Sequence, residues 1–314
     1  MTAPVRYRPL GRTGLDVSAL SLGAAPLGGA YQPIDQSSAD QLIRSALDLG
    51  VNLIDVAPYY GLGRAETVLG QALRGIARDR YLLATKIGRY GLDDFDFSAD
   101  RVKTSLDTSC GRLGTDQIDL VICHDVEFGD LDLIVSETIP AMRLAVDRGQ
   151  ARFVGISGLP LDSLQYVVER APLDFVLSYC HHTLLDQTLL ARLGDWKSRG
   201  LGVINASPLA MGLLTPQGPP SWHPAPEAMK TACREASQLC ESRGVDLASL
   251  AIQYSLQTEA IDCTLVGAST PEELRRNVEW IDTPINESTL ADVLHIFKPV
   301  RDQSWPSGRF GAPG

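Results

Sequence analysis

Basic residues and long apolar runs are both scarce in this sequence. Its 314 residues carry 28 Lys and Arg against 38 Asp and Glu, a formal net charge of −10 with a pI of about 5.0. Nucleic acids and anionic membrane surfaces attract basic proteins, so we expect neither as a partner. No stretch approaches the roughly 18 consecutive apolar residues of a membrane-spanning helix, and the start, MTAPVRYRPLGRTG, lacks the apolar segment of a secretory signal. These absences predict a cytoplasmic protein without a membrane anchor.

Cysteine is present, but not in any metal-binding or disulfide pattern. The six cysteines are scattered through the chain: Cys110, Cys123, Cys180, Cys233, Cys240 and Cys263. No C-x-x-C or H-x-x-x-H spacing occurs, and such a distribution is typical of reduced thiols in a cytosolic protein. His181 and His182 follow Cys180 directly, but neighbours on an extended segment point to opposite sides. We therefore expect no metal centre.

Short apolar runs alternate with longer amphipathic stretches along the whole chain. The predicted strands are Val17–Gly23, Asn52–Asp55, Tyr81–Lys86, Gln117–Cys123, Ala151–Ser157, Phe175–Tyr179, Gly202–Ala206 and Cys263–Gly267. The predicted helices are Ser37–Leu49, 65–73, one that Ser98 opens as N-cap, Leu131–Arg148, Leu161–Glu169, Gln187–Arg199, helices within Glu227–Thr258, and Pro271–Trp280. Strands without polar alternation are buried on both faces, as in a parallel sheet.

Eight strand–helix units in one chain favour a closed barrel over an open sheet. We predict an α/β protein with a (β/α)₈ barrel, a single domain over residues 1–314. No G-x-G-x-x-G follows a strand and opens a helix, which disfavours a Rossmann fold. A segment rich in proline and glycine at about 210–226 interrupts the pattern, and an extra helix and a tail occupy about 288–314. Because insertions after barrel strands carry function, the first of these is a candidate binding loop.

Polar residues stand at the predicted carboxyl ends of successive strands, where barrel enzymes place their active sites. Asp55 ends the second strand, Lys86 the third, and His124 follows the fourth; Tyr59 and Tyr60 come just after Asp55. A nearby ammonium favours a phenolate and lowers the pKa of a tyrosine from about 10. This set suits acid–base catalysis of proton movement, and a nicotinamide is implied as the hydride carrier.

Each of these residues taken singly also has a structural explanation. Lys86 could be an ion-pair partner of Asp55 inside the barrel, His124 a hydrogen-bonded structural histidine, and either tyrosine a packing residue. Their convergence at one mouth favours catalysis.

The segments DVAPYYG, LLATK, LVICHD, FVGISG, INASPLAMG and LVGASTPEELRRNV resemble, in order and spacing, the signature blocks of the aldo-keto reductases. The resemblance covers nearly the whole chain. It implies a (β/α)₈ barrel, a nicotinamide cofactor and a catalytic tetrad of Asp55, Tyr60, Lys86 and His124. Tyr60, directly before Gly61, takes the place of the proton donor and acceptor.

Within this superfamily the chain most resembles the branch that oxidises L-galactose, through CHDVEFGDLDLIVSETIPA, LSYCHH, ASPLAMGLLT and GPPSWHPAP among other stretches. The resemblance implies NAD-dependent oxidation of the anomeric C1 hydroxyl of L-galactose to the 1,4-lactone. Tyr60 would take the proton, and His124 would orient the hydroxyl. A related aldose, L-fucose or D-arabinose, and a nucleotide-binding regulatory barrel resembling potassium-channel β subunits stay open as alternatives.

The resemblance also assigns cofactor contacts after strands five to eight and in the C-terminal block: Ser157, Ser178, Ser207, Leu209, Gly212, Gly267, Ser269, Thr270, Glu273 and Asn277. Three positions depart from the superfamily pattern, with Gly158 for Asn, Ser178 for Gln, and Ala206 for a stacking aromatic. Gly267 and Glu273 stand where members that use NADP carry Lys and Arg. A carboxylate there disfavours a 2′-phosphate, so we expect NAD rather than NADP.

A sugar is the expected small-molecule partner, and its contacts are the least defined part of the site. Tyr60 and His124 must touch the reacting hydroxyl, and Phe128, Trp222 and Trp305 are further candidates because aromatic faces suit sugars. Packing is the competing explanation for each of the three aromatics. The surface pattern singles out no interface, which leaves the oligomeric state open.

Overall fold

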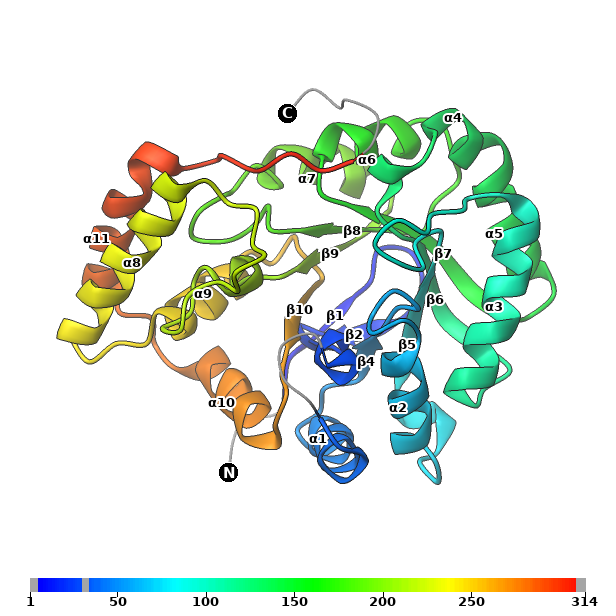
Figure 1. Ribbon diagram of the computed structural model, residues 1–314, viewed down its shortest axis with the longest axis horizontal. Helices are drawn as coiled ribbons and strands as arrows, with labels where there is room; N and C mark the ends of the chain where they lie inside the picture. The colour runs from blue at the N-terminus through cyan, green and yellow to red at the C-terminus, as the bar shows by residue number, and fades with distance from the viewer. Residues whose placement is uncertain (1–4, 30–33, 309–314) are drawn as a thin grey trace.

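Eight parallel strands close into a barrel in the computed structural model, which describes residues 5–29 and 34–308 (Figure 1). The strands are β3 (Leu20–Gly23), β4 (Leu53–Asp55), β5 (Leu82–Ile87), β6 (Ile118–Cys123), β7 (Ala151–Gly158), β8 (Phe175–Tyr179), β9 (Gly202–Ala206) and β10 (Cys263–Gly267). They follow chain order, and β10 closes the barrel by pairing with both β9 and β3. The predicted (β/α)₈ barrel is confirmed.

Helices surround the barrel on its outside (Figure 1). The principal ones are α1 (Gln36–Asp48), α2 (Arg64–Ala72), α3 (Ala99–Leu113), α5 (Ile139–Asp147), α6 (Leu161–Val168), α7 (Leu190–Ser198), α8 (Glu227–Ser242), α9 (Leu247–Leu256), α10 (Pro271–Asp282) and α11 (Glu287–Phe297). Ser98 caps α3 by accepting a hydrogen bond from the Arg101 backbone N–H, as the sequence predicts. No helix among residues 5–29 and 34–308 is long and apolar enough to cross a membrane.

The expected first strand, Val17–Gly23, is two strands with different roles. β2 (Asp16–Ser18) pairs antiparallel with β1 (Tyr7–Pro9), and only β3 enters the barrel. Leu10 and Leu15, in the hairpin's loop, pack with apolar side chains that point into the barrel interior from its strands. The hairpin thus covers the amino end of the barrel, while the carboxyl end carries the polar residues.

The helix expected over Leu131–Arg148 is not regular. A short α4 (Leu131–Leu133) runs into a π-helical turn, Ile134–Thr138, and then into α5. Pro140 has no N–H for an ordinary helical bond, and the widened turn before it is where the helix accommodates that loss.

Two segments border the carboxyl end of the barrel. Between the single turn at Ala210–Gly212 and α8, the chain has neither helix nor strand. After α11 the chain returns across the barrel as an extended segment, drawn in red in Figure 1, and Ser307 donates a hydrogen bond to Glu127. Residues 309–314 of the expected tail lie outside the described part of the chain.

Candidate active site

A buried ion pair lies at the carboxyl end of two neighbouring strands. Lys86 of β5 places Nζ 2.5 Å from Asp55 Oδ1 of β4 and 3.0 Å from the carbonyl oxygen of Val56. Both charged side chains are nearly inaccessible to solvent. They point into the barrel because they continue the alternation of the interior residues Leu53 and Ala84.

Tyr60 completes this arrangement from the turn between β4 and α2. Its hydroxyl lies 3.2 Å from Lys86 Nζ, and its ring centroid is 5.9 Å from that of His124. The next residue, Gly61, has φ of 62° and packs against Gly28 so closely that a Cβ would lie 2.4 Å from the Gly28 carbonyl oxygen. Only glycine satisfies both conditions, and the position of Tyr60 depends on it.

Burial dominates the electrostatics of this group. Burial opposes the charge on both Lys86 and Asp55: it raises the pKa of Asp55, while Asp55 and Tyr60 together raise the pKa of the ammonium. Because the two charges lie 2.5 Å apart, we take Lys86 and Asp55 as an ionised pair. Burial also raises the pKa of Tyr60 to about 12, although Lys86 acts in the opposite direction. The expected net lowering of this pKa was therefore wrong: in the protein alone desolvation outweighs the ammonium, and the phenol keeps its proton.

His124 follows β6 and faces the same interior space. Its pKa lies well below 6.5 because of burial and the positive charges of Lys86 and Arg89, so the imidazole is neutral. Nε2 is 3.6 Å from Asp125 Oδ2, and Nδ1 has no hydrogen-bond partner within the described chain. A neutral imidazole here can donate one hydrogen bond to a ligand oxygen.

Not all of the expected cofactor-binding residues lie at the carboxyl end of the barrel. Ser157 lies at the end of β7 and accepts a hydrogen bond from the Asp125 backbone N–H at 3.3 Å. Ser178 lies two residues after Val176 on β8 and therefore on the same face, which is turned toward the helices, and its hydroxyl lies 3.3 Å from His181 Nδ1. Ser178 therefore lies behind the mouth rather than in it.

The loop after β9 contains three more of these residues, Ser207, Leu209 and Gly212, all partly exposed. Ser207 has φ of 55° and Gly212 φ of 103°. Left-handed backbone at a non-glycine residue such as Ser207 costs energy and is typical of segments that hold a ligand.

The remaining expected cofactor residues surround the amino end of α10. Gly267 is exposed at the end of β10, and Asn277 is buried within the helix. Thr270 caps the helix by accepting a bond from the Glu273 N–H at 3.2 Å, while Glu273 Oε2 accepts one from the Ser269 N–H at 2.8 Å. Glu273 thus has a structural role in addition to the one the sequence suggested, in a variant of the capping box.

These groups fit a nicotinamide nucleotide in their chemistry. Ser157 offers a hydroxyl near the interior, Ser207 a hydroxyl and strained backbone beyond it, and the amino end of α10 a positive helix terminus. Such donors suit a carboxamide, a pyrophosphate and a ribose respectively.

The three aromatic candidates for sugar contact have different surroundings. Phe128 stacks on Phe95 with a centroid separation of 4.6 Å and an interplanar angle of 11°. Trp222, on the loop before α8, has 55% of its surface exposed, whereas Trp305 is buried and packs edge-on against His223. Packing explains Trp305, and Trp222 stays available for a ligand.

Sequence reasoning missed several charged or polar residues beside the mouth: Arg89, Asp125, Glu127 and Tyr179. Arg89 Nη1 lies 2.5 Å from Asp125 Oδ2, and Glu127 accepts a bond from the Leu159 N–H. For Asp125 and Glu127 the signal was the run HDVE directly after β6, where three ionisable side chains follow a buried strand whose one polar residue is Asp119.

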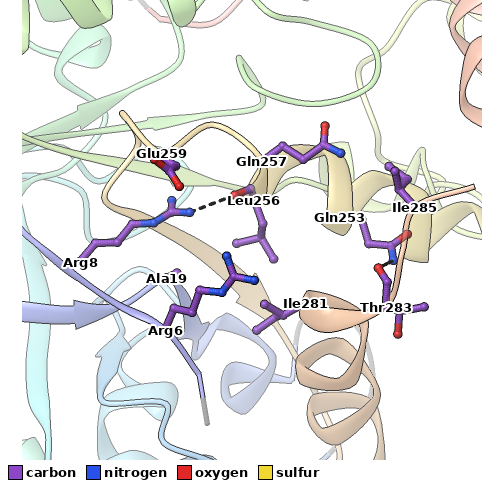
Figure 2. A pocket seen from close by; sticks show the side chains of 10 residues that line it. All are labelled: Arg6, Arg8, Ala19, Gln253, Leu256, Gln257, Glu259, Ile281, Thr283 and Ile285. Atoms are coloured by element: carbon purple, nitrogen blue, oxygen red, sulfur yellow. Dashed lines mark hydrogen bonds between the residues drawn. The ribbon is translucent and has the colours of Figure 1, made fainter. Parts of the chain in front are cut away.

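A cavity of about 200 Å³ lies near the amino end of the barrel, away from these residues (Figure 2). Arg8 crosses it and donates hydrogen bonds to the carbonyls of Leu256 and Ile261, and Gln253 donates one to the Thr283 carbonyl. Because backbone carbonyls already accept hydrogen bonds from these donors, the cavity marks where the hairpin packs against α9 and α10.

Comparison with known proteins agrees with this geometry. The model of the aldo/keto reductase family matches residues 19–296. This chain belongs to the aldo/keto reductase family. It is 47% identical to an L-galactose dehydrogenase of Arabidopsis thaliana, over 97% of this chain and 98% of that protein. A D-arabinose 1-dehydrogenase of Saccharomyces cerevisiae is 33% identical, over 93% and 94% of the two chains.

The solved structures include an aldo-keto reductase from Bacillus halodurans in its holo form. It superimposes with a TM-score of 0.77 at 26% sequence identity and covers 96% of this chain and 98% of its own. Aldo-keto reductases use nicotinamide cofactors, and this chain is therefore an oxidoreductase of that class.

Proposed function

We propose that this aldo-keto reductase oxidises the anomeric C1 hydroxyl of L-galactose to the 1,4-lactone with NAD. The observation that carries the proposal is the contact of Lys86 with both Asp55 and Tyr60, beside a neutral His124. The similarity to an L-galactose dehydrogenase along almost the entire chain supports this substrate.

His124 and Tyr60 divide the work on the C1 hydroxyl. The neutral imidazole of His124 donates a hydrogen bond to the hydroxyl oxygen and holds it near the tyrosine. Tyr60, as phenolate, takes the hydroxyl proton while the C1–H bond breaks and a carbonyl forms at C1. A bound nicotinamide supplies the acceptor for the hydride that leaves C1.

Lys86, held in place by Asp55, stabilises the phenolate form of Tyr60. The pKa of about 12 for Tyr60 in the protein alone is too high for a base at neutral pH. The ammonium of Lys86, 3.2 Å away, stabilises the phenolate directly, and Asp55 holds that ammonium in place. A positive charge brought close to Tyr60 by an oxidised cofactor would lower this pKa further.

NAD is the proposed cofactor because of Gly267 and Glu273. Neither residue offers a positive charge to a 2′-phosphate, and the Glu273 carboxylate adds negative charge at the amino end of α10. The similarity to a D-arabinose 1-dehydrogenase makes D-arabinose the second candidate substrate, with L-fucose as a further related aldose.

Initial rates of absorbance change at 340 nm test the proposal. L-galactose, L-fucose and D-arabinose are each supplied with NAD and then with NADP. We expect the fastest reduction with L-galactose and NAD, and faster turnover of another aldose would move the substrate but keep the chemistry. Tyr60→Phe should abolish turnover and leave NAD binding intact, and full activity in this variant would contradict the assigned base.

A further inference from the structure

Arg89, two residues after the end of β5, is a cation enclosed by aromatic rings and a carboxylate. Its guanidinium carbon lies 3.9 Å from the centroid of the Tyr59 ring and 5.0 Å from that of Phe128, and Nη1 lies 2.5 Å from Asp125 Oδ2. Only 15% of the Arg89 side chain is exposed. Aromatic faces and a carboxylate together hold the cation in one place.

Asp125 is itself constrained. Its backbone has φ of 54°, a left-handed conformation that few residues other than glycine, asparagine and aspartate tolerate. Its N–H donates to Ser157 Oγ, and its carboxylate is almost fully buried. The constraint directs the carboxylate toward both Arg89 and the neighbouring His124.

One carboxylate oxygen of Asp125 lies close to both Arg89 and His124. Asp125 Oδ2, which binds Arg89, is also 3.6 Å from His124 Nε2, too far for a hydrogen bond, so it attracts the Nε2 proton electrostatically and leaves the N–H free to donate to a ligand. Because a carboxylate accepts but does not donate, this arrangement favours the tautomer of His124 that carries its proton on Nε2.

We propose, on the basis of the proposed function, that Asp125 and Arg89 are positioning residues that fix the ring and the Nε2–H tautomer of His124 for the reacting hydroxyl. The guanidinium balances the charge of the buried carboxylate, and the carboxylate orients the imidazole. The pair acts through His124 rather than on the substrate.

The charges around His124 explain why both Arg89 and Asp125 are needed to keep the imidazole neutral and in one tautomer. Lys86 and Arg89 approach from β5 and the segment after it, Tyr59 and Tyr60 from the turn after β4, and Asp125 from the segment after β6. Lys86 and Arg89 oppose a positive charge on the imidazole. Without Arg89, an uncompensated carboxylate would favour the imidazolium, which no longer has a lone pair or a defined tautomer.

Nuclear magnetic resonance of histidine labelled with ¹⁵N tests this directly, without any substrate. The chain has five histidines, and the signal of His124 is assigned by its loss in His124→Gln. We expect a neutral, Nε2-protonated ring in the wild type. Asp125→Asn should mix the tautomers, and Arg89→Met should raise the pKa of His124 by about one unit or more. Arg143→Met, which breaks a remote pair with Asp174, should change neither signal.

Kinetics supply the second measurement. Asp125→Asn and Arg89→Met should lower kcat for L-galactose about 10- to 100-fold with an unchanged Kd for NAD, and Arg89→Lys should recover part of the loss. An unchanged tautomer in Asp125→Asn, or an unchanged pKa in Arg89→Met, overturns the proposal whatever the rates. A wild type that has the expected histidine signals but oxidises no aldose contradicts the proposed function alone.

Discussion

Glu127, beside the mouth of the barrel, tests whether burial raises the pKa of a carboxyl there and makes stability depend on pH. Its side chain is 3% exposed, and Oε1 accepts hydrogen bonds from the Leu159 N–H at 3.1 Å and the Ser307 hydroxyl at 2.9 Å. Oε2 is buried without a partner in the described chain. Burial, with the negative charge of Asp125, raises the pKa of Glu127 from 4.5 to about 7.

The size of the effect on stability follows from this shift. Between 4.5 and about 7 the difference is about 2.5 units, and each unit corresponds to about 1.4 kcal/mol, so ionisation costs the folded state about 3–4 kcal/mol. The carboxyl is protonated in both states below pH 4.5. Between pH 4.5 and about 7 the unfolded chain releases this proton while the folded protein retains it, so the free energy of unfolding falls with rising pH, and the loss is complete once the folded carboxyl is also ionised above pH 7.

Urea denaturation between pH 4.5 and 8.5 measures this loss. Glu127→Gln keeps the shape of the side chain and cannot ionise, so its free energy of unfolding should fall less over this range than that of the wild type, by about 3–4 kcal/mol. Glu241→Gln, on the exposed end of α8, should follow the wild type. Parallel curves for Glu127→Gln and the wild type would show that Glu127 is ionised in the folded protein at little cost, and would refute the reasoning.

Three further substitutions test other parts of the site. Lys86→Met leaves Asp55 buried without its cation; it should abolish turnover and lower the free energy of unfolding at pH 7 by about 3–5 kcal/mol, measured by urea denaturation. Gly267→Lys with Glu273→Arg should shift the ratio of kcat/KM toward NADP, and an unchanged ratio would show that the 2′ pocket lies elsewhere. Trp222→Ala, at a side chain 55% exposed, should change stability by less than about 0.5 kcal/mol and raise KM for the sugar, and an unchanged KM would make Trp222 a surface residue only.

The barrel could be predicted because its strands have a simple pattern. Runs such as Ile118–Cys123 are buried at every position and contain one polar residue, Asp119, and this largely apolar character is typical of a parallel strand covered by helices. The same criterion failed at Val17–Gly23, where an edge hairpin and a barrel strand are joined through Ala19 and burial continues without a break from one to the other. Only the pairing partners distinguish the two, and these come from distant parts of the chain.

The residues at the strand ends could also be predicted, because the fold brings every carboxyl end to one mouth. Asp55, Lys86 and Tyr60 lie in contact as expected from that rule. Arg89 and Asp125 were missed because each lies two residues beyond the last residue of its strand, where the strand no longer sets the direction of the side chain. Their partnership depends on the left-handed turn at Asp125 and on aromatic rings from three separate segments.

The pKa of Tyr60 could not be predicted from the sequence, because it depends on how deeply the phenol is buried. Proximity to Lys86 and burial act on the phenol with opposite signs, and the sequence indicates the first but not the depth of the second. The two energies depend differently on the surroundings: the attraction of one ammonium changes little once contact is made, while desolvation grows as each neighbouring group excludes water. Asp55 adds to the imbalance, because the carboxylate that holds Lys86 in place also opposes the phenolate. A protein that needs Tyr60 as a base must therefore obtain the missing stabilisation from a positive charge that arrives with its ligand, which couples proton removal to occupancy of the cofactor site.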